Sequence, residues 1–302
     1  MNFSLPDGLA VRVAATGDVE AITALIAACE LADDGAVEID ATDVVQFLES
    51  APDPLDAIVV TEAGRIVAWG ALNGERCYVD VHPGGRGRGV GGALLAWSED
   101  RARAHGRPLV RQTVTDNDRA AAALFRALGY APAHTSWIID IALGDEPSPV
   151  VVPAGIAIRP YGPENDRASH RLIDDAFSEW PGRDPLAFED WASLVTAHGA
   201  FAPGLSRLAF DGDELVGVAL AYDYGVADEG WVQQLATKAS HRHRGIARAL
   251  LGSVFVAFHA QGRRRTVALS TDSRTGALSL YERLGMRVRR SYTGWAKDLG
   301  QP

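Results

Sequence analysis

Two short runs of glycine and arginine are the residues in this chain whose types and spacing best suit a chemical role. Arg86-Gly-Arg-Gly-Val-Gly91 and Arg242-His-Arg-Gly-Ile-Ala247 share the pattern Arg-x-x-Gly-x-Gly/Ala, between a strand-like segment and a helix-like one. Glycine lets the backbone turn sharply and approach a ligand closely. The amide groups at a helix N-terminus attract anions, and arginines add charge-assisted bonds to phosphate. The two runs therefore predict turns that bind a pyrophosphate.

Two familiar phosphate-binding motifs fit these runs less well. Gly87-Arg-Gly-Val-Gly-Gly92 satisfies the dinucleotide-binding glycine pattern, but residues 107–111 read Arg-Pro-Leu-Val-Arg, without the acidic residue that this motif needs about 20 positions on. A Walker A loop needs Gly-Lys-Ser/Thr, and neither Lys238 nor Lys297 follows a glycine. The alternative is a glycine-rich turn whose arginines are solvated and bind no ligand. This alternative is disfavoured because the motif occurs twice, each time between a predicted strand and a predicted helix.

The chain contains two copies of one sequence pattern. Residues 86–95 align with 242–251 at an offset of 156, and the same offset pairs Leu128-Gly129 with Leu284-Gly285. Residues 144–149, Gly-Asp-Glu-Pro-Ser-Pro, are typical of a linker. We expect an N-terminal domain over 1–146, a linker over 147–153 and a C-terminal domain over 154–302.

The elements that must position the glycine turns follow one order in both copies. A short strand comes first, followed by helical stretches, a hairpin around Gly64 or Gly212, and a strand over 77–81 or 231–237. After the glycine turn come an amphipathic helix, another strand and a second helix, with apolar residues at i, i+3, i+4 and i+7. This order predicts an α+β protein with two tandem domains, each a mixed, mostly antiparallel central sheet flanked by helices.

Composition excludes several functional classes. The 302 residues are 47% hydrophobic and 23% charged with a net charge of −10, which disfavours binding to nucleic acid or anionic membranes. No apolar run reaches the ~18 residues of a membrane span, and the first residues do not resemble a signal peptide. The two cysteines, Cys29 and Cys77, suit a reducing compartment. The eight histidines lack metal-ligand spacing. We expect a cytoplasmic monomer or homodimer without a metal.

The glycine turns and the segments downstream of them carry a family resemblance. Residues 81–95 together with Asn117 and residues 121–130 resemble the GNAT superfamily of acetyl-CoA-dependent N-acetyltransferases, and residues 235–247 with 277–286 resemble it as well. The tandem arrangement is similar in architecture to that of the mycothiol synthases. The resemblance covers the CoA-binding half of each copy and implies acetyl-CoA as the co-substrate.

By this resemblance, the residues that contact CoA lie at the end of one strand, in the glycine turn and after the next strand. They are Val81, Arg86, Gly87, Arg88, Gly89, Val90, Gly91, Gly92 and Asn117 in the first copy, and Leu235, Ala236, Thr237, Arg242, His243, Arg244, Gly245, Ile246, Ala247, Arg248, Ser273 and Tyr281 in the second. For Asn117 and Ser273, helix N-capping is an equal alternative.

Acetyl transfer to an amine requires a proton acceptor for the amine and is helped by an acid for the departing thiolate. The family's usual acid is a tyrosine on the second helix; Tyr281 holds that position in the second copy, and Phe125 replaces it in the first. The alternative is that Tyr281 is only a core aromatic residue, because it lies on the apolar helix face.

The general base is expected among acidic residues near the strand before the glycine turn. In the histone-acetyltransferase branch a glutamate lies six residues before the valine preceding the turn, which is Glu75 here; the second copy has Trp231 there, with Glu229 two residues earlier. Glu229 belongs to an acidic hairpin with Asp223 and Asp228. The alternative is that these carboxylates are merely solvated at the surface and take no part in catalysis. Glu179 and Asp184 are further candidates for the acceptor cleft.

These patterns together predict an acyltransferase that moves an acetyl group from acetyl-CoA to a primary amine of a small molecule. We expect catalysis chiefly in the C-terminal domain, where an intact glycine turn is combined with Tyr281. The alternatives are a non-catalytic CoA-binding sensor or scaffold, and a protein or peptide N-acetyltransferase.

Overall fold

The computed structural model describes residues 5–49, 51, 53–144, 147–179, 185–225, 229–262 and 266–300. Its contacts divide the chain into two compact units. The first unit comprises Met1–Thr135 and Ser291–Pro302, and the second comprises Ser136–Arg290. The segment from 291 onward thus belongs to the first unit although it ends the second sequence copy.

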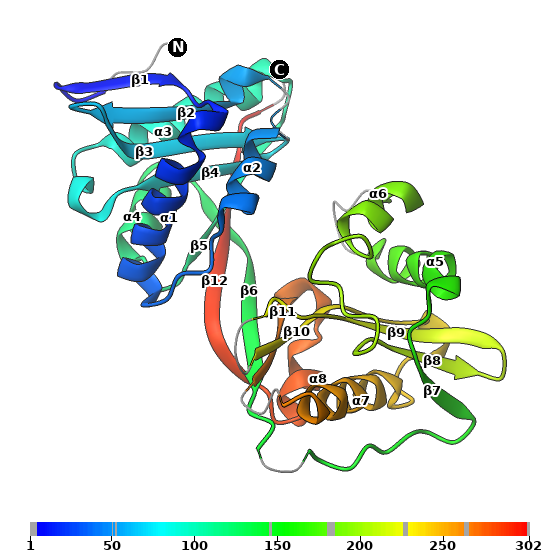
Figure 1. The fold of residues 1–302 in the computed structure, drawn as a ribbon. Coiled ribbons are helices and arrows are strands. Elements are labelled where there is room, and N and C mark those ends of the chain that lie inside the picture. Colours follow the sequence, from blue (N-terminus) through cyan, green and yellow to red (C-terminus); the bar gives the residue numbers. More distant parts are fainter. Residues whose placement is uncertain are drawn as a thin grey trace. The chain divides into compact units, whose positions relative to one another are not determined.

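The first unit is a mixed sheet with helices on both faces (Figure 1). Its strands lie in the order β1-β2-β3-β4-β5-β12, of which only β4 and β5 are a parallel pair. The strand bounds are β1 Leu9–Val13, β2 Ala57–Glu62, β3 Arg65–Asn73, β4 Arg76–Val81, β5 Leu109–Thr115 and β12 Arg287–Asp298; the helices are α1 Val19–Asp34, α2 Ala41–Glu49, α3 Val90–Ala104 and α4 Arg119–Ala127.

The alternation of side chains along β2 explains this layering. Val59 packs with α1 and α2 on one face, whereas Ile58 and Val60 pack with α3 on the other. Successive residues of a strand point to opposite faces, so an unbroken apolar run is needed where both faces are covered. The run Ala-Ile-Val-Val over 57–60 meets this need.

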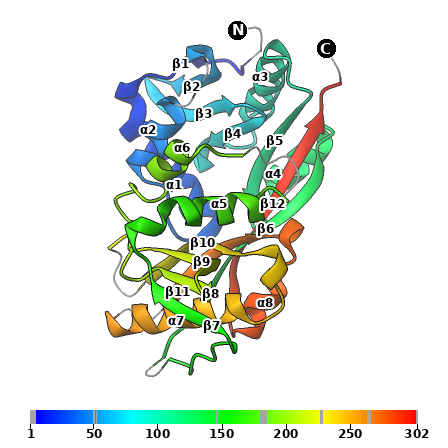
Figure 2. The ribbon, with the colours of Figure 1, turned by 90° about the vertical axis from the view of Figure 1, so that its right-hand side faces the viewer.

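The second unit repeats the arrangement (Figure 2). Its strands lie in the order β6-β11-β10-β9-β8-β7, with bounds β6 Ala131–Ile141, β7 Ile156–Pro160, β8 Arg207–Asp211, β9 Glu214–Tyr222, β10 Glu229–Thr237 and β11 Thr266–Asp272. The helices are α5 Asp166–Phe177, α6 Phe188–Leu194, α7 Ile246–Ala260 and α8 Leu278–Arg283. Val218 and Leu220 pack with α5 and α6, and Ala219 between them packs with α7. The expected α+β, two-domain architecture is confirmed.

The two sequence copies exchange their last strands. Residues Tyr292–Asp298 of β12 pair antiparallel with β5 in the first unit. Residues Ser136–Ile141 of β6 pair antiparallel with β11 in the second unit. The bounds 1–146, 147–153 and 154–302 describe the repeat in the sequence and stay a prediction for the folding domains.

The final segment is anchored in the first unit by a buried tryptophan and two polar contacts. Trp295 is 2% exposed and stacks on Phe125, with ring centroids 5.6 Å apart. Lys297 Nζ donates to the buried carboxylate of Glu99, at 2.7 and 2.8 Å. Thr293 Oγ1 donates to Asp116 at 2.6 Å. The segment is therefore part of the core of the first unit.

We expect Trp295→Ala to destabilise the first unit by about 3–5 kcal/mol, the usual cost of emptying a buried tryptophan site. In a unit of this size, that corresponds to a lower melting temperature by about 10 °C, measurable by differential scanning calorimetry. Val37→Ala, at a 50% exposed position of the same unit, is the control and is expected to change the melting temperature little. An equal effect of the two substitutions would contradict the anchoring role.

Candidate active site

In each unit, two parallel strands separate toward the glycine turn. The pairing of β4 with β5 is limited to Arg76 and Arg111, at the start of β4. β10 pairs with β11 only over Glu229–Trp231 and Thr266–Ala268 within the described residues. Because the strands run in the same direction from a shared start, their carboxyl ends diverge. In the first unit the side chain of Gln112 on β5 reaches across part of this gap and donates to the carbonyl of Val79 at 3.1 Å. Such a gap can admit an extended ligand.

The strand before the turn differs between the units. β10 has a register shift against β9 between Val232 and Gln234, which is a β-bulge, whereas β4 pairs with β3 in continuous register. A bulge leaves one residue out of the ladder and re-aims the neighbouring groups. Trp191 Nε1 holds Gln234 beside the bulge by a 3.1 Å hydrogen bond to its Oε1. The position of this bulge could not be predicted from the sequence. The signal related to it there is the hairpin before β10, which is longer than its counterpart in the first copy.

The two glycine turns follow the same backbone path. Gly89 (φ +87°) precedes α3 and Gly245 (φ +84°) precedes α7, both in the left-handed region that favours glycine. Gly87 (φ +78°) has its counterpart in His243, which adopts φ +62° with a side chain. Each turn leads into a 15-residue helix, so the amide groups and dipole of its N-terminus are available to an anion.

The arginines of the turns are held by carboxylates from other elements. Arg86 makes a bidentate ion pair with Asp33 at 2.6 and 2.7 Å, and Arg242 makes the same pair with Glu179 at 2.7 and 2.9 Å. The second arginine of each turn is also paired: Arg88 with Glu62 at 2.8 Å and Arg244 with Asp211 at 3.2 Å. Glu179, expected at the acceptor cleft, therefore lies at the glycine turn.

Two features of the second turn suit a phosphate-bearing ligand such as CoA. Arg248, exposed in the first turn of α7, has no ion-pair partner among the residues that the structure describes. The hydroxyl of Thr237, at the end of β10, is buried and lacks a hydrogen-bond partner within the same residues. A buried unsatisfied hydroxyl costs about 1–3 kcal/mol, and a polar ligand atom at the turn would recover part of that. The residues present thus fit a ligand with phosphate and amide groups.

Tyr281 on α8 is 6% exposed and belongs to the main apolar cluster of the second unit. Burial raises the pKa of its hydroxyl to about 12, against a smaller opposing effect of a hydrogen bond with Thr271. The phenol therefore keeps its proton at neutral pH and can donate it. Its counterpart Phe125 is 2% exposed in the first unit and carries no proton to donate.

Both candidate bases are engaged in ion pairs. Glu229, the first residue of β10, accepts from Arg289 Nη1 at 3.1 and 3.2 Å. Glu75 lies in the turn before β4, 3.3 Å from Arg111. The remaining acidic candidates add little: Asp223 accepts from the amide of Gly225 at 2.9 Å. Asp184 and Asp228 lie outside the described residues.

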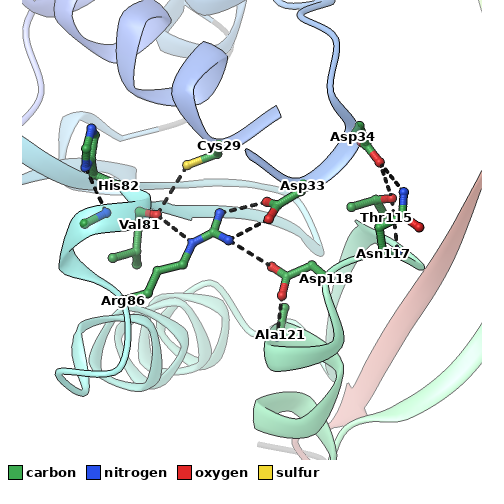
Figure 3. Close-up of polar contacts among 11 residues, drawn as sticks. Cys29, Asp33, Asp34, Val81, His82, Arg86, Thr115, Asn117, Asp118 and Ala121 are labelled. Carbon is green, nitrogen blue, oxygen red and sulfur yellow. Dashed lines mark hydrogen bonds and ion pairs between the residues drawn. The ribbon is translucent and has the colours of Figure 1, made fainter. Parts of the chain in front are cut away.

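Asn117 and Ser273 are not the residues that cap the helices following them. Asp118 accepts from the amide of Ala121 to cap α4. In the second unit Asp272 accepts from the amide of Arg274 and caps the 3-10 turn Ser273–Thr275, whereas Ala277 precedes α8 without a side-chain cap. Asn117 Nδ2 instead donates to Asp34 Oδ1 at 3.0 Å (Figure 3). The capping alternative for these two positions is therefore wrong, because Asp118 caps α4 and α8 has no side-chain cap.

Within the part of the chain that the structure describes, no group of three metal-ligating side chains occurs. No helix within the same residues is long and apolar enough to cross a membrane. Cys29 and Cys77 are buried free thiols, and burial raises the pKa of each to about 12.

Comparison with known proteins defines the class. Residues 166–286 match the acetyltransferase (GNAT) family, and residues 54–132 match an acetyltransferase (GNAT) domain. The architecture is similar to that of a GCN5-related N-acetyltransferase from Sphaerobacter thermophilus, with a TM-score of 0.82 and 32% identity over 99% of this chain and 98% of that one. A tandem GNAT protein from the clavulanic acid biosynthesis pathway has a TM-score of 0.71 at 20% identity, covering 97% of this chain and 99% of that one. The chain belongs to the GNAT family of N-acetyltransferases.

Within that family, the chain resembles the mycothiol acetyltransferases. The protein of that name from Thermomonospora curvata is 31% identical over 251 residues, which cover 80% of each chain. The one from Kineococcus radiotolerans is 30% identical over 255 residues, covering 78% of this chain and 79% of that one. The recognition of two tandem GNAT domains in an acetyltransferase is confirmed, and the family uses acetyl-CoA.

Proposed function

We propose that this protein transfers the acetyl group of acetyl-CoA to a primary amine of a small molecule, chiefly in its second unit. The observation that carries the proposal is the presence in one unit of both Tyr281, buried on α8, and the glycine turn at Gly245. In the first unit Phe125 replaces the tyrosine. The name of the mycothiol acetyltransferase relatives supports a small-molecule acceptor. A cytoplasmic location and a monomeric or dimeric state belong to the same proposal.

In this proposal the two reacting groups meet where β10 and β11 separate. The amine gives up a proton to a base and its nitrogen bonds to the thioester carbonyl carbon. The carbon–sulfur bond then breaks, and the departing thiolate takes a proton from Tyr281 Oη. Glu229 is proposed as the base, with Glu75 in that role in the first unit. The CoA contacts proposed for the second unit include Leu235, Ala236 and Ile246 beside the turn residues described above.

The same apolar surroundings make the proton transfer feasible. A phenol whose pKa is about 12 is a weak acid for a solvated thiolate, whose pKa is about 8.5. Apolar surroundings destabilise the charged thiolate as well and raise the pKa of its thiol, which reduces the difference in proton affinity between thiolate and phenol.

The experiment is to measure CoA release from acetyl-CoA with a chromogenic thiol reagent and a panel of small amines, lysine peptides and peptides with free N-termini. We expect turnover with small amines and little with peptides. Acetylated product is followed by mass spectrometry as well, because an acceptor that itself carries a thiol would react with the reagent. Binding of acetyl-CoA without turnover of any acceptor would favour the sensor or scaffold, and faster turnover of peptides would favour a protein acetyltransferase.

A further inference from the structure

The C-terminal end of α1 is fastened to both sides of the strand gap in the first unit (Figure 3). Cys29 Sγ donates to the carbonyl of Val81 at 3.3 Å. Asp33 binds the guanidinium of Arg86 through both oxygens. One helical position further on, Asp34 Oδ1 accepts from Thr115 Oγ1 at 2.7 Å and from Asn117 Nδ2 at 3.0 Å. We call Cys29, Asp33 and Asp34 the α1 clasp.

The α1 clasp spans the open end of the gap. Val81 is the last residue of β4 and Thr115 the last residue of β5, and these strands pair only at the other end, at Arg76 and Arg111. The clasp therefore connects the two strand ends where they are unpaired. The helix end is itself fixed, since Gly35 (φ +73°) closes α1 with a 3.1 Å bond from its amide to the carbonyl of Leu31.

The groups held by the clasp are those assigned to CoA in the first unit. Val81, Arg86 and Asn117 are three of the predicted CoA contacts, and each of them is bonded to the clasp. The carboxylates of Asp33 and Asp34 also place negative charge beside the path of an anionic ligand, where like charges repel. Acetyl-CoA and the clasp thus compete for the same polar groups, which are the carbonyl of Val81 and the donors of Arg86 and Asn117.

We propose that the α1 clasp keeps the CoA cleft of the first unit closed by self-occupation, and that Asp34 must leave Thr115 and Asn117 before acetyl-CoA enters. This inference rests on the proposed function for the assignment of CoA to the glycine turn. The apparent affinity of the first unit for acetyl-CoA is then reduced by the small fraction of molecules in which the clasp is open.

The second copy carries only half of the clasp in its sequence. Glu179 takes the place of Asp33, at an offset of 146, and binds Arg242 in the same bidentate manner. The next residue in the chain is Trp180, which has no carboxylate. An ion pair between a turn arginine and a carboxylate at or just after the end of the preceding helix is therefore common to both units, and the bonds from Asp34 to Thr115 and Asn117 add a link to the second strand in the first unit.

The test uses the full chain with Gly245→Glu, so that only the first unit can bind, and titrates acetyl-CoA by calorimetry. Asp34→Ala removes the acceptor of the clasp, and Thr115→Val removes one of its donors while keeping all charges. We expect both variants to bind acetyl-CoA at least about tenfold more tightly than the parent, since each loses one or two hydrogen bonds that hold the closed state. Asp7→Asn, exposed in the same unit, controls for the change in net charge and is expected to leave the affinity unchanged.

Unchanged or weaker binding in both clasp variants, with melting temperatures close to that of the parent, would overturn the clasp. A gain for Asp34→Ala that Asp7→Asn reproduces would also overturn it, because general repulsion would then be the cause. Failure of the proposed function is seen separately, as absence of turnover by the second unit in the Gly89→Glu variant.

Discussion

Gly245→Glu is expected to abolish binding of acetyl-CoA to the second unit, a loss of affinity of at least about 100-fold. The added carboxylate stands at the N-terminus of α7, where the turn would receive the pyrophosphate, and the two negative charges repel each other at short range. Space does not limit the substitution, because among the described residues the atom within 4 Å of a Cβ at Gly245 is Pro153 Cγ, at 3.7 Å. Because the α1 clasp closes the cleft of the first unit, calorimetry on the wild type is expected to show one binding site for acetyl-CoA, in the second unit. Gly245→Glu is expected to remove that site.

Two controls separate charge from backbone strain. Gly245→Asn introduces a residue type that tolerates the left-handed region and adds no charge. This variant is therefore expected to bind acetyl-CoA more tightly than the glutamate variant does. Gly89→Glu changes the corresponding position of the first unit, where no atom of the described residues lies within 4 Å of the added Cβ. It is expected to leave the observed site intact. Loss of that site in Gly89→Glu, and not in Gly245→Glu, would place acetyl-CoA binding in the first unit.

The glycine turns could be predicted from the sequence because their structure is local. Gly89 and Gly245 mark a left-handed turn into a helix, and the repeat offset showed that the context is shared. The helix faces followed from their apolar spacing, and Phe258 and Tyr281 are buried as that spacing predicts. The turn conformation and the buried helix face each depend on residues within one or two helical turns of the position concerned.

The strand exchange could not be predicted, because both candidate partners of a last strand offer nearly equivalent edges. The repeat pairs Trp137 with Trp295, and each is an apolar residue within a long strand. Side-chain pattern fixes which face of a strand is buried, but it does not say which sheet receives that strand. The choice of sheet depends on how the whole chain is arranged in three dimensions.

The ion pairs of the turns were likewise out of reach of pattern analysis. Asp33 lies 53 positions from Arg86, and Glu179 lies 63 positions from Arg242. A surface arginine can pair with any carboxylate that the fold brings close, and the sequence contains 39 acidic residues. The turn arginines were therefore predicted to be available to phosphate, whereas four of them already hold carboxylates.

Tyr281→Phe is expected to lower kcat by about 100-fold or more, within the range that general acid–base catalysis contributes, with little change in KM for acetyl-CoA. The substitution removes only the hydroxyl, and the ring keeps its place in the apolar cluster. Because burial raises the pKa of Tyr281 to about 12, the wild-type acid stays protonated up to roughly pH 10. Deprotonation of Tyr281 should therefore not limit activity between neutral pH and that value. Initial rates over a pH series measure both effects.

Tyr222→Phe is the matched control in the same unit, because it also removes a buried tyrosine hydroxyl, one that donates to the carbonyl of Val195 at 2.9 Å. It is expected to cost about 1 kcal/mol of stability and to leave kcat nearly unchanged. If Tyr281→Phe behaved in the same way, Tyr281 would be a core aromatic residue only, and the thiolate would have to be protonated by solvent. A selective fall in kcat for Tyr281→Phe, with unaltered CoA binding, would instead assign the hydroxyl to the chemical step. Removal of one oxygen atom would then have lowered the rate of catalysis without changing binding.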